Sequence, residues 1–399
     1  MEKNKDHRQL GIEMDLFFID PFVGKGFPIW LPNGLILKNK IRDFIIEQEK
    51  KYNFELVETP VIGSVELYKK SGHYDHYKEN IFPIMKLDEG EEFVLRPMAC
   101  PHHIMIYKHK LRSYKNLPIR LAEQVYQFRY ESSGGLLGLE RVRAMNLTDS
   151  HIFLRDDQIE QEIENAFNIV KSTLEKFNIN IDYIELALHD PKDKEKYHQD
   201  DEKWRLAEQS LKNFLENKNI KYISKIGEAA FYGPKIDIQI KTKLNHIITL
   251  STIQLDFVLP EKFDIFYVDK NLNKKRPIMI HRGLIGTYER FISVLLEQTQ
   301  GDFPLWLAPI QVAVVPVSKY QSNYANEIYN SLIDNNIRAI LDDTEERLSN
   351  KIRILNERKV KIQLIVGENE ERDGKVSCRL LGKKANKIVV LKDILNLFK

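Results

Sequence analysis

The chain has 399 residues, with 43% hydrophobic and 30% charged residues, as expected for a folded protein of two or three compact domains. Cys100 and Cys378 are its only cysteines, which excludes a disulfide framework and favours a reducing compartment. The formal charge of +2 excludes a polycationic protein, and no apolar run reaches the roughly 18 residues that span a bilayer. The sequence therefore predicts a soluble, cytoplasmic protein with no membrane-spanning segment.

Residues 35–52 predict a long amphipathic helix, because apolar side chains recur at helical spacing. A strand is predicted over residues 54–62, and Pro60 near its end confines that strand to the edge of a sheet. A helix is predicted over residues 156–177, and further strands over 117–131, 150–154, 235–242 and 246–259. This irregular order predicts an α+β fold around an antiparallel sheet.

The pattern changes after residue 305. Strands and helices then alternate as in an α/β unit, with helices predicted near residues 320–333 and 347–359. We therefore predict one domain over residues 1–305 and a smaller one over 306–399. The smaller domain has 16 Lys and Arg against 12 Asp and Glu. This excess fits contact with a polyanion or, equally, a solvated charged face.

Two clusters could carry chemistry. Residues 128–143 predict a hairpin in which Arg129 and Glu131 share one face, with Arg141 returning on the partner strand. Guanidinium groups beside a carboxylate could hold a phosphate and an amino-bearing ring, or could form only a salt-bridged exposed hairpin. Residues 281–290 place glycines beside Arg290, which fits close approach of a ligand or a simple turn before a helix.

The run Phe128-Arg129-Tyr130-Glu131 with Gly138 and Arg141, and the later Gly286, Glu289 and Arg290, resemble motifs 2 and 3 of class II aminoacyl-tRNA synthetases. The helix before Glu58-Thr59-Pro60 resembles motif 1. Residues 96–103, 149–153, 230–236, 254–257 and 277–282 are similar to the threonyl-tRNA synthetases of this class. The resemblance runs from about residue 6 to the C-terminus.

The resemblance implies both a fold and an activity. The fold is the class II antiparallel sheet flanked by helices, followed by a smaller α/β anticodon-binding domain. The activity is ATP-dependent ligation of L-threonine to the 3′ end of tRNA(Thr) through threonyl-adenylate, with Mg²⁺ accompanying ATP. A homodimer is also implied, because motif 1 commonly builds a two-fold interface in this class.

The resemblance further implies one zinc ion (Zn²⁺) per chain, held by Cys100, His151 and His281. Singly, such residues are more often packed in a core, and gaps of 51 and 130 residues match no local zinc motif. One thiolate and two imidazoles do suit zinc, and three protein ligands leave a position for the threonine amino and hydroxyl groups. Valine should then be rejected strongly, whereas serine, which lacks only a methyl group, should be admitted in part.

Other roles implied by the resemblance fall into four groups. The residues expected to bind ATP are Arg129, Glu131, Arg141, Lys235 and Arg290. Those expected to bind threonine are Met98, Asp149 and Tyr232. The anticodon contacts are expected at Arg353, Glu370 and Arg379. The residues expected to act in catalysis are Arg129 and Arg290, which neutralise phosphate charge, and His73 and Gln254, which lie near the terminal ribose of tRNA; His73 could equally be a surface loop histidine.

Some positions depart from the family pattern. Met145 stands where an aromatic residue usually stacks under adenine, although its polarizable sulfur can also cover a ring face. Further departures are His102, Leu147, Thr249 and Glu345. Relatives in bacteria usually carry an N-terminal domain that hydrolyses mischarged seryl-tRNA. We expect an enzyme without such editing in cis, as a natural form or a shortened chain.

Two other functions stay open. One is a non-catalytic, synthetase-like accessory protein, which would typically have lost the motif arginines or metal ligands that this sequence retains. The other is a synthetase of the same subclass for proline or serine. Zinc content and the amino acid that drives ATP–pyrophosphate exchange distinguish these functions from threonine ligation.

Overall fold

The computed structural model describes residues 4–383 and 385–398, which divide into two compact units. The first unit is built mainly from Ile19–Pro28 and Arg42–Gln298. The second combines Lys5–Phe18 and Ile29–Ile41 with the chain from Thr299 onward. No helix in the described ranges is both long enough and apolar enough to cross a membrane.

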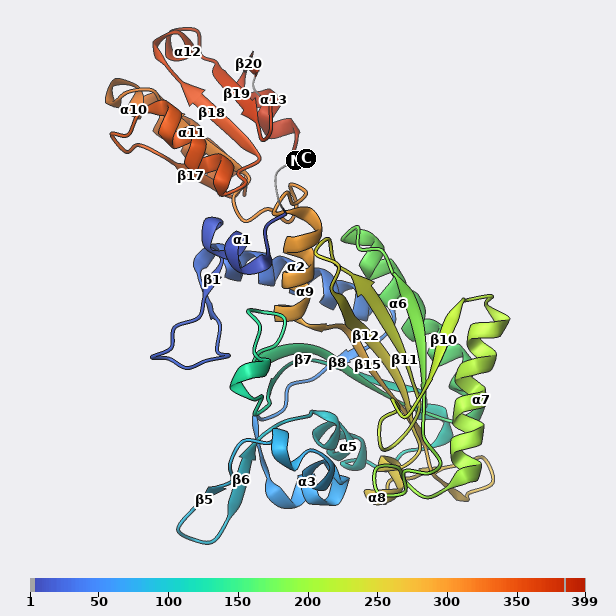
Figure 1. Ribbon diagram of the computed structural model, residues 1–399. Coiled ribbons are helices and arrows are strands. Elements are labelled where there is room, and N and C mark those ends of the chain that lie inside the picture. Colours follow the sequence, from blue (N-terminus) through green and yellow to red (C-terminus); the bar gives the residue numbers. More distant parts are fainter. Residues whose placement is uncertain (1–3, 384, 399) are drawn as a thin grey trace. The chain divides into compact units, whose positions relative to one another are not determined.

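An eight-stranded sheet forms the centre of the first unit (Figure 1). Its strand order is β10-β9-β11-β12-β15-β8-β7-β3, and all neighbours are antiparallel except β10 with β9 and β3 with β7. The strands are β3 (Glu55–Leu56), β7 (Ile119–Phe128), β8 (Ala144–Leu154), β9 (Tyr183–Leu188), β10 (Tyr222–Ile226), β11 (Lys235–Lys241), β12 (Ile247–Asp256) and β15 (Ile278–Thr287). The expected α+β architecture around an antiparallel sheet is confirmed.

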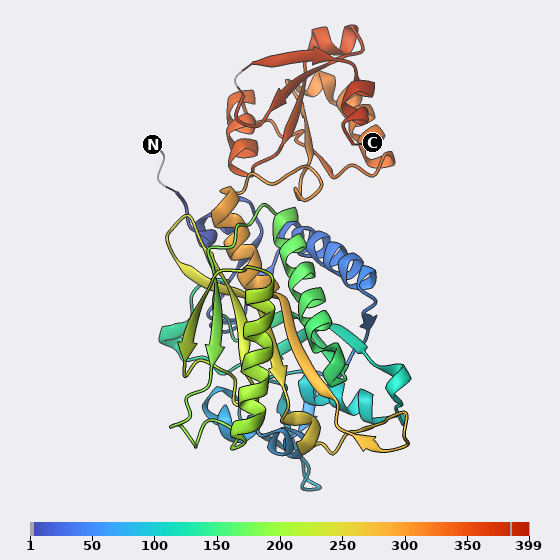
Figure 2. The same cartoon turned by 90° about the vertical axis from the view of Figure 1, so that its right-hand side faces the viewer.

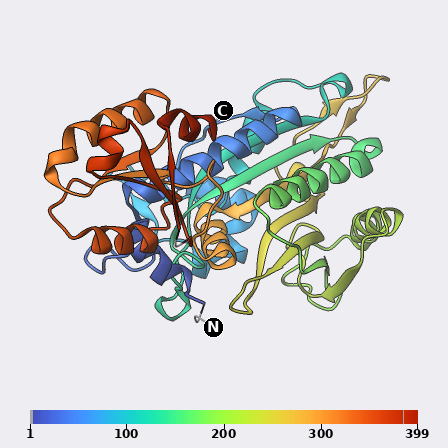
Figure 3. The same ribbon diagram turned by 90° about the horizontal axis from the view of Figure 1, so that it is seen from above.

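Helices α6 (Ile159–Lys176) and α7 (Asp201–Asn217) cover one face of this sheet. Each buries apolar side chains spaced three or four residues apart, such as Ile163, Phe167 and Val170 of α6. The two helices lie side by side in Figure 2, and Figure 3 shows α7 along its axis. The other face of the sheet is left for shorter elements.

Those shorter elements include α5 (Cys100–Lys108), whose Ile104 and Tyr107 pack on Leu121 of β7 and Phe153 of β8. The Tyr107 and Phe153 rings stack with centroids 4.6 Å apart. The remaining elements of this part of the unit are β4 (Ile62–Ser64), α3 (Val65–Ser71), α4 (His73–His76), β5 (Met85–Lys86), β6 (Glu92–Leu95), α8 (Leu259–Lys262), β13 (Tyr267–Val268) and β14 (Lys274–Lys275). Helix α5 begins at Cys100, and Pro101 follows as its second residue, a position where proline suits a helix start.

The helix predicted over residues 35–52 is α2 (Pro32–Lys51), which continues along the chain to β3. Near its end, Glu49 forms an ion pair of 2.7 Å with Arg282 of β15, and both side chains are fully buried. Burial raises the pKa of Glu49 to about 7 despite the opposing charge of Arg282. The strand predicted over residues 54–62 is at the sheet edge as expected, but only Glu55 and Leu56 pair with β7.

The second unit contains a five-stranded sheet with the order β17-β16-β18-β19-β20. Strands β17, β16 and β18 are parallel, and β19 and β20 are antiparallel to their neighbours. The elements of this sheet and its helices are β16 (Val312–Pro316), α10 (Ser322–Asp334), β17 (Ala339–Leu341), α11 (Leu348–Glu357), β18 (Ile362–Val366), α12 (Glu368–Arg372), β19 (Val376–Leu380), β20 (Asn386–Val389) and α13 (Leu391–Asn396). The expected alternation of strands and helices after residue 305 is confirmed.

Helices cover both faces of this smaller sheet. Successive side chains of β16 point to opposite faces, so alternate residues pack against different helices. Val312 and Val314 pack with Ile328 of α10, whereas Ala313 and Val315 pack with Leu355 of α11. The second unit also includes α1 (His7–Glu13), β1 (Phe17–Phe18) and β2 (Ile29–Trp30), and α9 (Tyr288–Thr299) closes the first. Each unit therefore has an apolar core of its own.

Candidate functional site

Antiparallel pairing places polar side chains from several strands on one face of the eight-stranded sheet. His151 of β8 lies opposite His281 of β15, which lies opposite Gln254 of β12. Asp149 of β8 lies opposite Glu123 of β7. Because directly opposed residues project from the same face, the sheet gathers side chains that are far apart in the sequence.

Cys100, His151 and His281 form a buried cluster on this face. Cys100 is the first residue of α5, and the two histidines come from adjacent strands. Their ligand atoms all lie within 4.8 Å of one another, and their relative exposures are 3%, 1% and 6%. The structure thus brings together the three residues that the sequence analysis assigned to a metal.

Hydrogen bonds decide which imidazole nitrogens carry a proton. Asp256 Oδ2 lies 2.8 Å from His281 Nε2, and a carboxylate can only accept, so Nε2 donates and Nδ1 keeps a lone pair. His103 Nε2, 2.9 Å from Glu123, donates in the same way, which leaves His103 Nδ1 to accept from His151 Nδ1 at 2.8 Å. The lone pairs of His151 Nε2 and His281 Nδ1 then face each other across 3.1 Å, an arrangement that a cation stabilises.

The chemistry of these donors fits zinc. A thiolate and two imidazoles are among its preferred ligands, and three protein ligands leave a fourth position open. Burial raises the pKa of the Cys100 thiol well above its ordinary value and lowers that of His151 well below it. Without a cation, burial therefore favours the uncharged forms, and a bound divalent cation favours the thiolate.

Two of the residues predicted to bind threonine are Asp149, which lies beside the cluster, and Met98, which lies next to Arg129 of the predicted ATP site. Asp149 Oδ1 is 3.9 Å from His151 Nε2, and Asp149 Oδ2 accepts a hydrogen bond of 3.2 Å from Gln127. Burial raises the pKa of Asp149. The sulfur of Met98 lies 3.4 Å from Nη2 of Arg129.

The third of these residues, Tyr232, stacks on His281, one of the candidate metal ligands. Its ring centroid is 4.7 Å from that of His281, and its hydroxyl donates a 2.5 Å hydrogen bond to Gln254 Oε1. At the next residue, Gly233, the backbone lies directly against β12: a Cβ there would be 1.7 Å from the carbonyl oxygen of Leu255. Tyr232 and Gln254 therefore line the same side of the metal cluster.

His73 is buried against the same cluster. His73 is only 1% exposed. Its Nδ1 lies 2.8 Å from Ser71 Oγ, and its Nε2 lies 3.4 Å from Cys100 Sγ. Burial and nearby basic groups lower the pKa of His73 to about 3. The alternative that His73 is a surface loop residue is wrong, because Phe231 and Tyr232 also pack against its ring.

Arg129 and Arg290 form an electropositive part of the site. Within the described chain neither makes an ion pair with a carboxylate, and the Nε of Arg129 is buried without a partner. Arg290 instead donates to the carbonyl oxygens of Glu140 and Thr249 at 3.1 and 3.4 Å. Burial, followed by the charge of Arg129, lowers the pKa of Arg290. Two neighbouring guanidinium groups in this state fit a polyanion such as a triphosphate.

The other three residues predicted to bind ATP, Glu131, Arg141 and Lys235, all take part in ion pairs within the protein. Arg141 Nε lies 2.9 Å from Glu131 Oε2, and Lys235 of β11 forms an ion pair with Asp237. The salt-bridged hairpin that the sequence left open is thus present. Ligand binding to these side chains would compete with the ion pairs that they already make.

The expected strand positions of the hairpin residues are wrong in detail. The ladder of β7 and β8 ends with the hydrogen bond of 2.9 Å from the Arg129 N–H to the Arg143 carbonyl. Glu131 and Arg141 lie in the loop beyond this point, where Gly138 adopts a positive φ of 48°. The loop, and not a pair of extended strands, therefore sets where these side chains lie.

Three departures from the family pattern lie on the site face of the sheet. Met145 is 6% exposed, and Leu147 pairs with Val125 of β7. Thr249, on β12, donates a 3.0 Å hydrogen bond to Gln239 of β11. Met145 is therefore buried, and the Thr249 hydroxyl is held within the sheet.

The predicted anticodon residues belong to the second unit. Arg353 of α11 is exposed and forms an ion pair of 2.7 Å with Glu357. Arg379 of β19 pairs with Gln363, whose side chain bonds to Asn356, so Arg379 is on the α11 side of the sheet. Glu370 lies at the start of α12 and accepts a 3.0 Å hydrogen bond from the Gly367 N–H.

Several side chains that contact the site were not named from the sequence. Gln127 bonds to Asp149, and Asp256 bonds to His281. His103 bonds to His151 and in turn to Glu123. One signal was available: His103 lies three residues after Cys100, on the same face of a helix. No comparable spacing marks Glu123, because its role depends on strand pairing.

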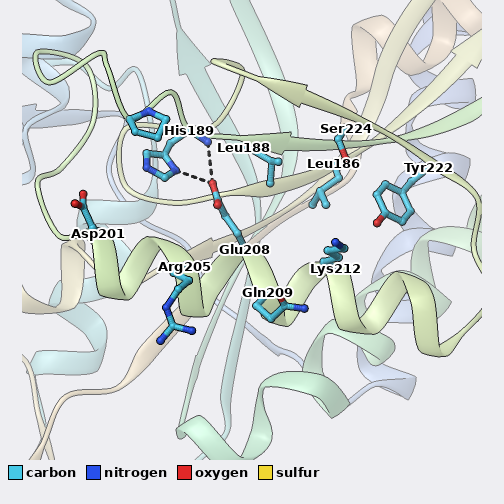
Figure 4. A pocket seen from close by; sticks show the side chains of 11 residues that line it. Leu186, Leu188, His189, Asp201, Arg205, Glu208, Gln209, Lys212, Tyr222 and Ser224 are labelled. Carbon is cyan, nitrogen blue, oxygen red and sulfur yellow. Dashed lines mark hydrogen bonds and ion pairs between the residues drawn. The ribbon is translucent and has the colours of Figure 1, made fainter.

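A cavity of about 430 Å³, lined by both polar and apolar side chains, lies apart from this cluster, between α7 and the strands β9 and β10 (Figure 4). His189 donates to Glu208 across it at 2.7 Å, and the charged side chains of Arg205 and Lys212 project from α7. None of the residues that line it was predicted as a site residue.

Family comparisons match both parts of the chain. Residues 82–299 match the class II core domain of tRNA synthetases for Gly, His, Pro, Ser and Thr, and residues 311–399 match an anticodon-binding domain. The chain is 50% identical to the threonine–tRNA ligase of Mycoplasma genitalium over 96% of its own length and 68% of that protein. It is 48% identical to the threonine–tRNA ligase of Ureaplasma parvum over 99% and 68%.

Solved structures agree with these matches. A structure described as the RNA-binding domain of threonyl-tRNA synthetase from Cryptosporidium parvum superposes with a TM-score of 0.91 at 36% identity, covering 99% of this chain and 98% of that one. Prolyl-tRNA synthetase from Giardia lamblia shares the fold at 17% identity, with a TM-score of 0.75 over 97% of this chain and 74% of that one. The chain therefore belongs to the threonyl-tRNA synthetases, the class II threonine–tRNA ligases with a C-terminal anticodon-binding domain.

Proposed function

We propose that the enzyme activates L-threonine with ATP to threonyl-adenylate and transfers it to the 3′ end of tRNA(Thr), selecting threonine at a zinc ion held by Cys100, His151 and His281. The observation that carries this proposal is the convergence of a buried thiol and two imidazole lone pairs on one point of the sheet. When bound there, zinc supplies a Lewis-acidic position for the amino and hydroxyl groups of threonine.

The protein groups of the first step mainly position and neutralise charge. We propose that Asp149, held by Gln127, binds the threonine amino group, and that Tyr232 and Met98 line the same pocket. Arg129 and Arg290, which have no carboxylate partner in the described chain, offset charge on the triphosphate together with Mg²⁺. We propose that Glu131, Arg141 and Lys235 complete the ATP site once their ion pairs open.

In the second step, a ribose hydroxyl of tRNA takes the threonyl group. We propose that His73 and Gln254 act near that hydroxyl, a role supported by their contacts with Cys100 and Tyr232. Residues 1–305 would form the catalytic domain and residues 306–399 the anticodon-binding domain, with Arg353, Glu370 and Arg379 contacting anticodon bases. Base edges in single-stranded RNA suit such polar side chains.

We expect threonine, serine and valine to support ATP–pyrophosphate exchange with clearly different values of kcat/KM. We expect valine to support exchange about 10⁴-fold less efficiently than threonine in kcat/KM, because it leaves a hydroxyl-binding site unsatisfied. Serine lacks only a methyl group, so its kcat/KM should fall by about 10–200-fold. Equal exchange with valine and serine, or exchange with proline alone, would contradict zinc-based selection of threonine.

The relatives bear on the two alternative functions. The two threonine–tRNA ligases share 50% and 48% sequence identity with the chain, whereas the prolyl enzyme shares 17%, a level that supports similarity of fold alone. A non-catalytic accessory role is disfavoured by the intact cluster of candidate metal ligands and by Arg129 and Arg290, which have no carboxylate partner among the described residues. Threonine-dependent charging of tRNA remains the function that these residues support best.

We propose that the enzyme is a homodimer. Support comes from the Glu58-Thr59-Pro60 segment at the sheet edge, where Leu56, Val61 and Ile62 are 40–42% exposed. Apolar side chains beside an edge strand commonly mark an interface. Sedimentation at micromolar concentration should give the mass of two chains, and a single-chain mass would contradict the proposal.

A further inference from the structure

We propose that Glu123 and His103 form a relay that orients His151 as a metal ligand, so that a buried hydrogen-bond network beginning at Thr59 controls how tightly the metal is held. The inference rests on the proposed zinc site but concerns residues that do not touch the metal. His103 and Glu123 are therefore positioning residues.

The outer end of the relay is a carboxylate held by three groups. Glu123, which is 2% exposed, accepts hydrogen bonds of 2.9 Å from both the N–H and the hydroxyl of Thr59. Arg96, also 2% exposed, lies 3.3 Å from Glu123 and donates to the Thr59 hydroxyl and carbonyl oxygens at 2.6 and 3.0 Å. A buried carboxylate with this many donors has little freedom to turn away from His103.

The inner end of the relay fixes one ring against another. The rings of His103 and His151 are nearly perpendicular, at 84°, with centroids 4.6 Å apart and the two Nδ1 atoms 2.8 Å apart. Since His103 Nε2–H donates to the Glu123 carboxylate, the neutral His103 ring can only accept at Nδ1, and the proton of His151 must lie on Nδ1. This keeps the lone pair of His151 on Nε2, which faces His281.

The relay treats the two histidine ligands differently. His281 contacts a carboxylate directly, through Asp256. His151 Nδ1 reaches one through His103, and that carboxylate is shared with Thr59 and Arg96. The metal site is therefore linked by unbroken hydrogen bonds to the Glu58-Thr59-Pro60 segment at the sheet edge. Partners of metal-bound histidines typically change metal affinity by about 10–100-fold when removed.

The test compares two adjacent histidines of α5. His103→Leu removes both ring nitrogens of the relay, and His102→Leu makes the same change at a half-buried ring whose Nδ1 has no partner in the described chain. His103→Asn retains an amide that can still accept from His151 Nδ1. Zinc content of each whole protein is measured by elemental analysis, its zinc Kd by competition with a chromogenic chelator, and its folding by circular dichroism.

We expect His103→Leu to weaken the zinc Kd by about 10–100-fold, His103→Asn to lie between it and the parent, and His102→Leu to stay within about threefold of the parent. Equal losses in His102→Leu and His103→Leu would overturn the relay in favour of a general packing effect, as would an unchanged Kd in His103→Leu. A parent protein that binds no zinc would instead refute the proposed zinc site, so the two failures are distinguishable.

Discussion

Replacing Cys100 with serine will abolish stoichiometric zinc binding and lower kcat/KM for threonine in ATP–pyrophosphate exchange by more than about 10²-fold. This loss exceeds the roughly 10–100-fold loss that is usual when only a hydrogen-bond partner of a metal ligand is removed. Serine has nearly the same size as cysteine, so it preserves the packing of α5 on the sheet. Its hydroxyl does not ionise at neutral pH and cannot replace the thiolate that balances the metal charge. The two remaining imidazoles, His151 and His281, would hold zinc only weakly.

Cys378 provides a matched control, because it is the only other cysteine in the sequence. It is 8% exposed, lies in the apolar core of the second unit and is not a member of the described cluster of candidate metal ligands. Cys378→Ser should retain one zinc per chain and near-parental exchange, although burying a hydroxyl there will cost about 1–3 kcal/mol of stability. Full exchange by a zinc-free Cys100→Ser protein would refute metal-assisted selection of threonine.

The long elements could be predicted from the sequence because their apolar spacing alone decides which side is buried. The helix predicted over residues 35–52 is α2 (Pro32–Lys51), and the strand predicted over 235–242 is β11 (Lys235–Lys241). The strand predicted over residues 54–62 was too long. The N–H of Thr59 bonds to the Glu123 side chain and not to a neighbouring strand, so side-chain chemistry ends the pairing there.

The site itself could be predicted only as far as local motifs reach. Motif resemblance identified Cys100, His151 and His281, but nothing in their spacing shows that three distant positions meet. Their meeting depends on the register that sets His151 opposite His281, and Glu123 opposite Asp149. A shift of one residue in this pairing would turn those side chains to the opposite face, and local sequence patterns do not encode that register.

Replacing Arg129 with glutamine should lower kcat for ATP–pyrophosphate exchange by about 10²–10³-fold, as expected when one preorganised group facing transition-state charge is lost. The stability of the folded protein should change little. Arg129 has a buried Nε without a partner and lies close enough to Arg290 for its charge to lower that residue's pKa. Removing Arg129 relieves a like-charge repulsion with Arg290 but also removes an attraction that lowers the pKa of the buried Asp149. Because these two effects oppose each other, thermal unfolding should occur close to the parental temperature.

Arg129→Lys distinguishes charge from geometry in the same experiment. A lysine restores the charge but not the planar pair of donors that binds two phosphate oxygens, so exchange should recover only in part. Arg205→Gln is the matched control, because Arg205 is an exposed arginine of α7 that lines the separate cavity of Figure 4. Exchange by Arg129→Gln within about threefold of the Arg205→Gln rate would show that Arg129 does not serve the triphosphate. A large drop in unfolding temperature would show instead that its charge has a structural partner, and that the pair of guanidinium groups was not assembled for an anion.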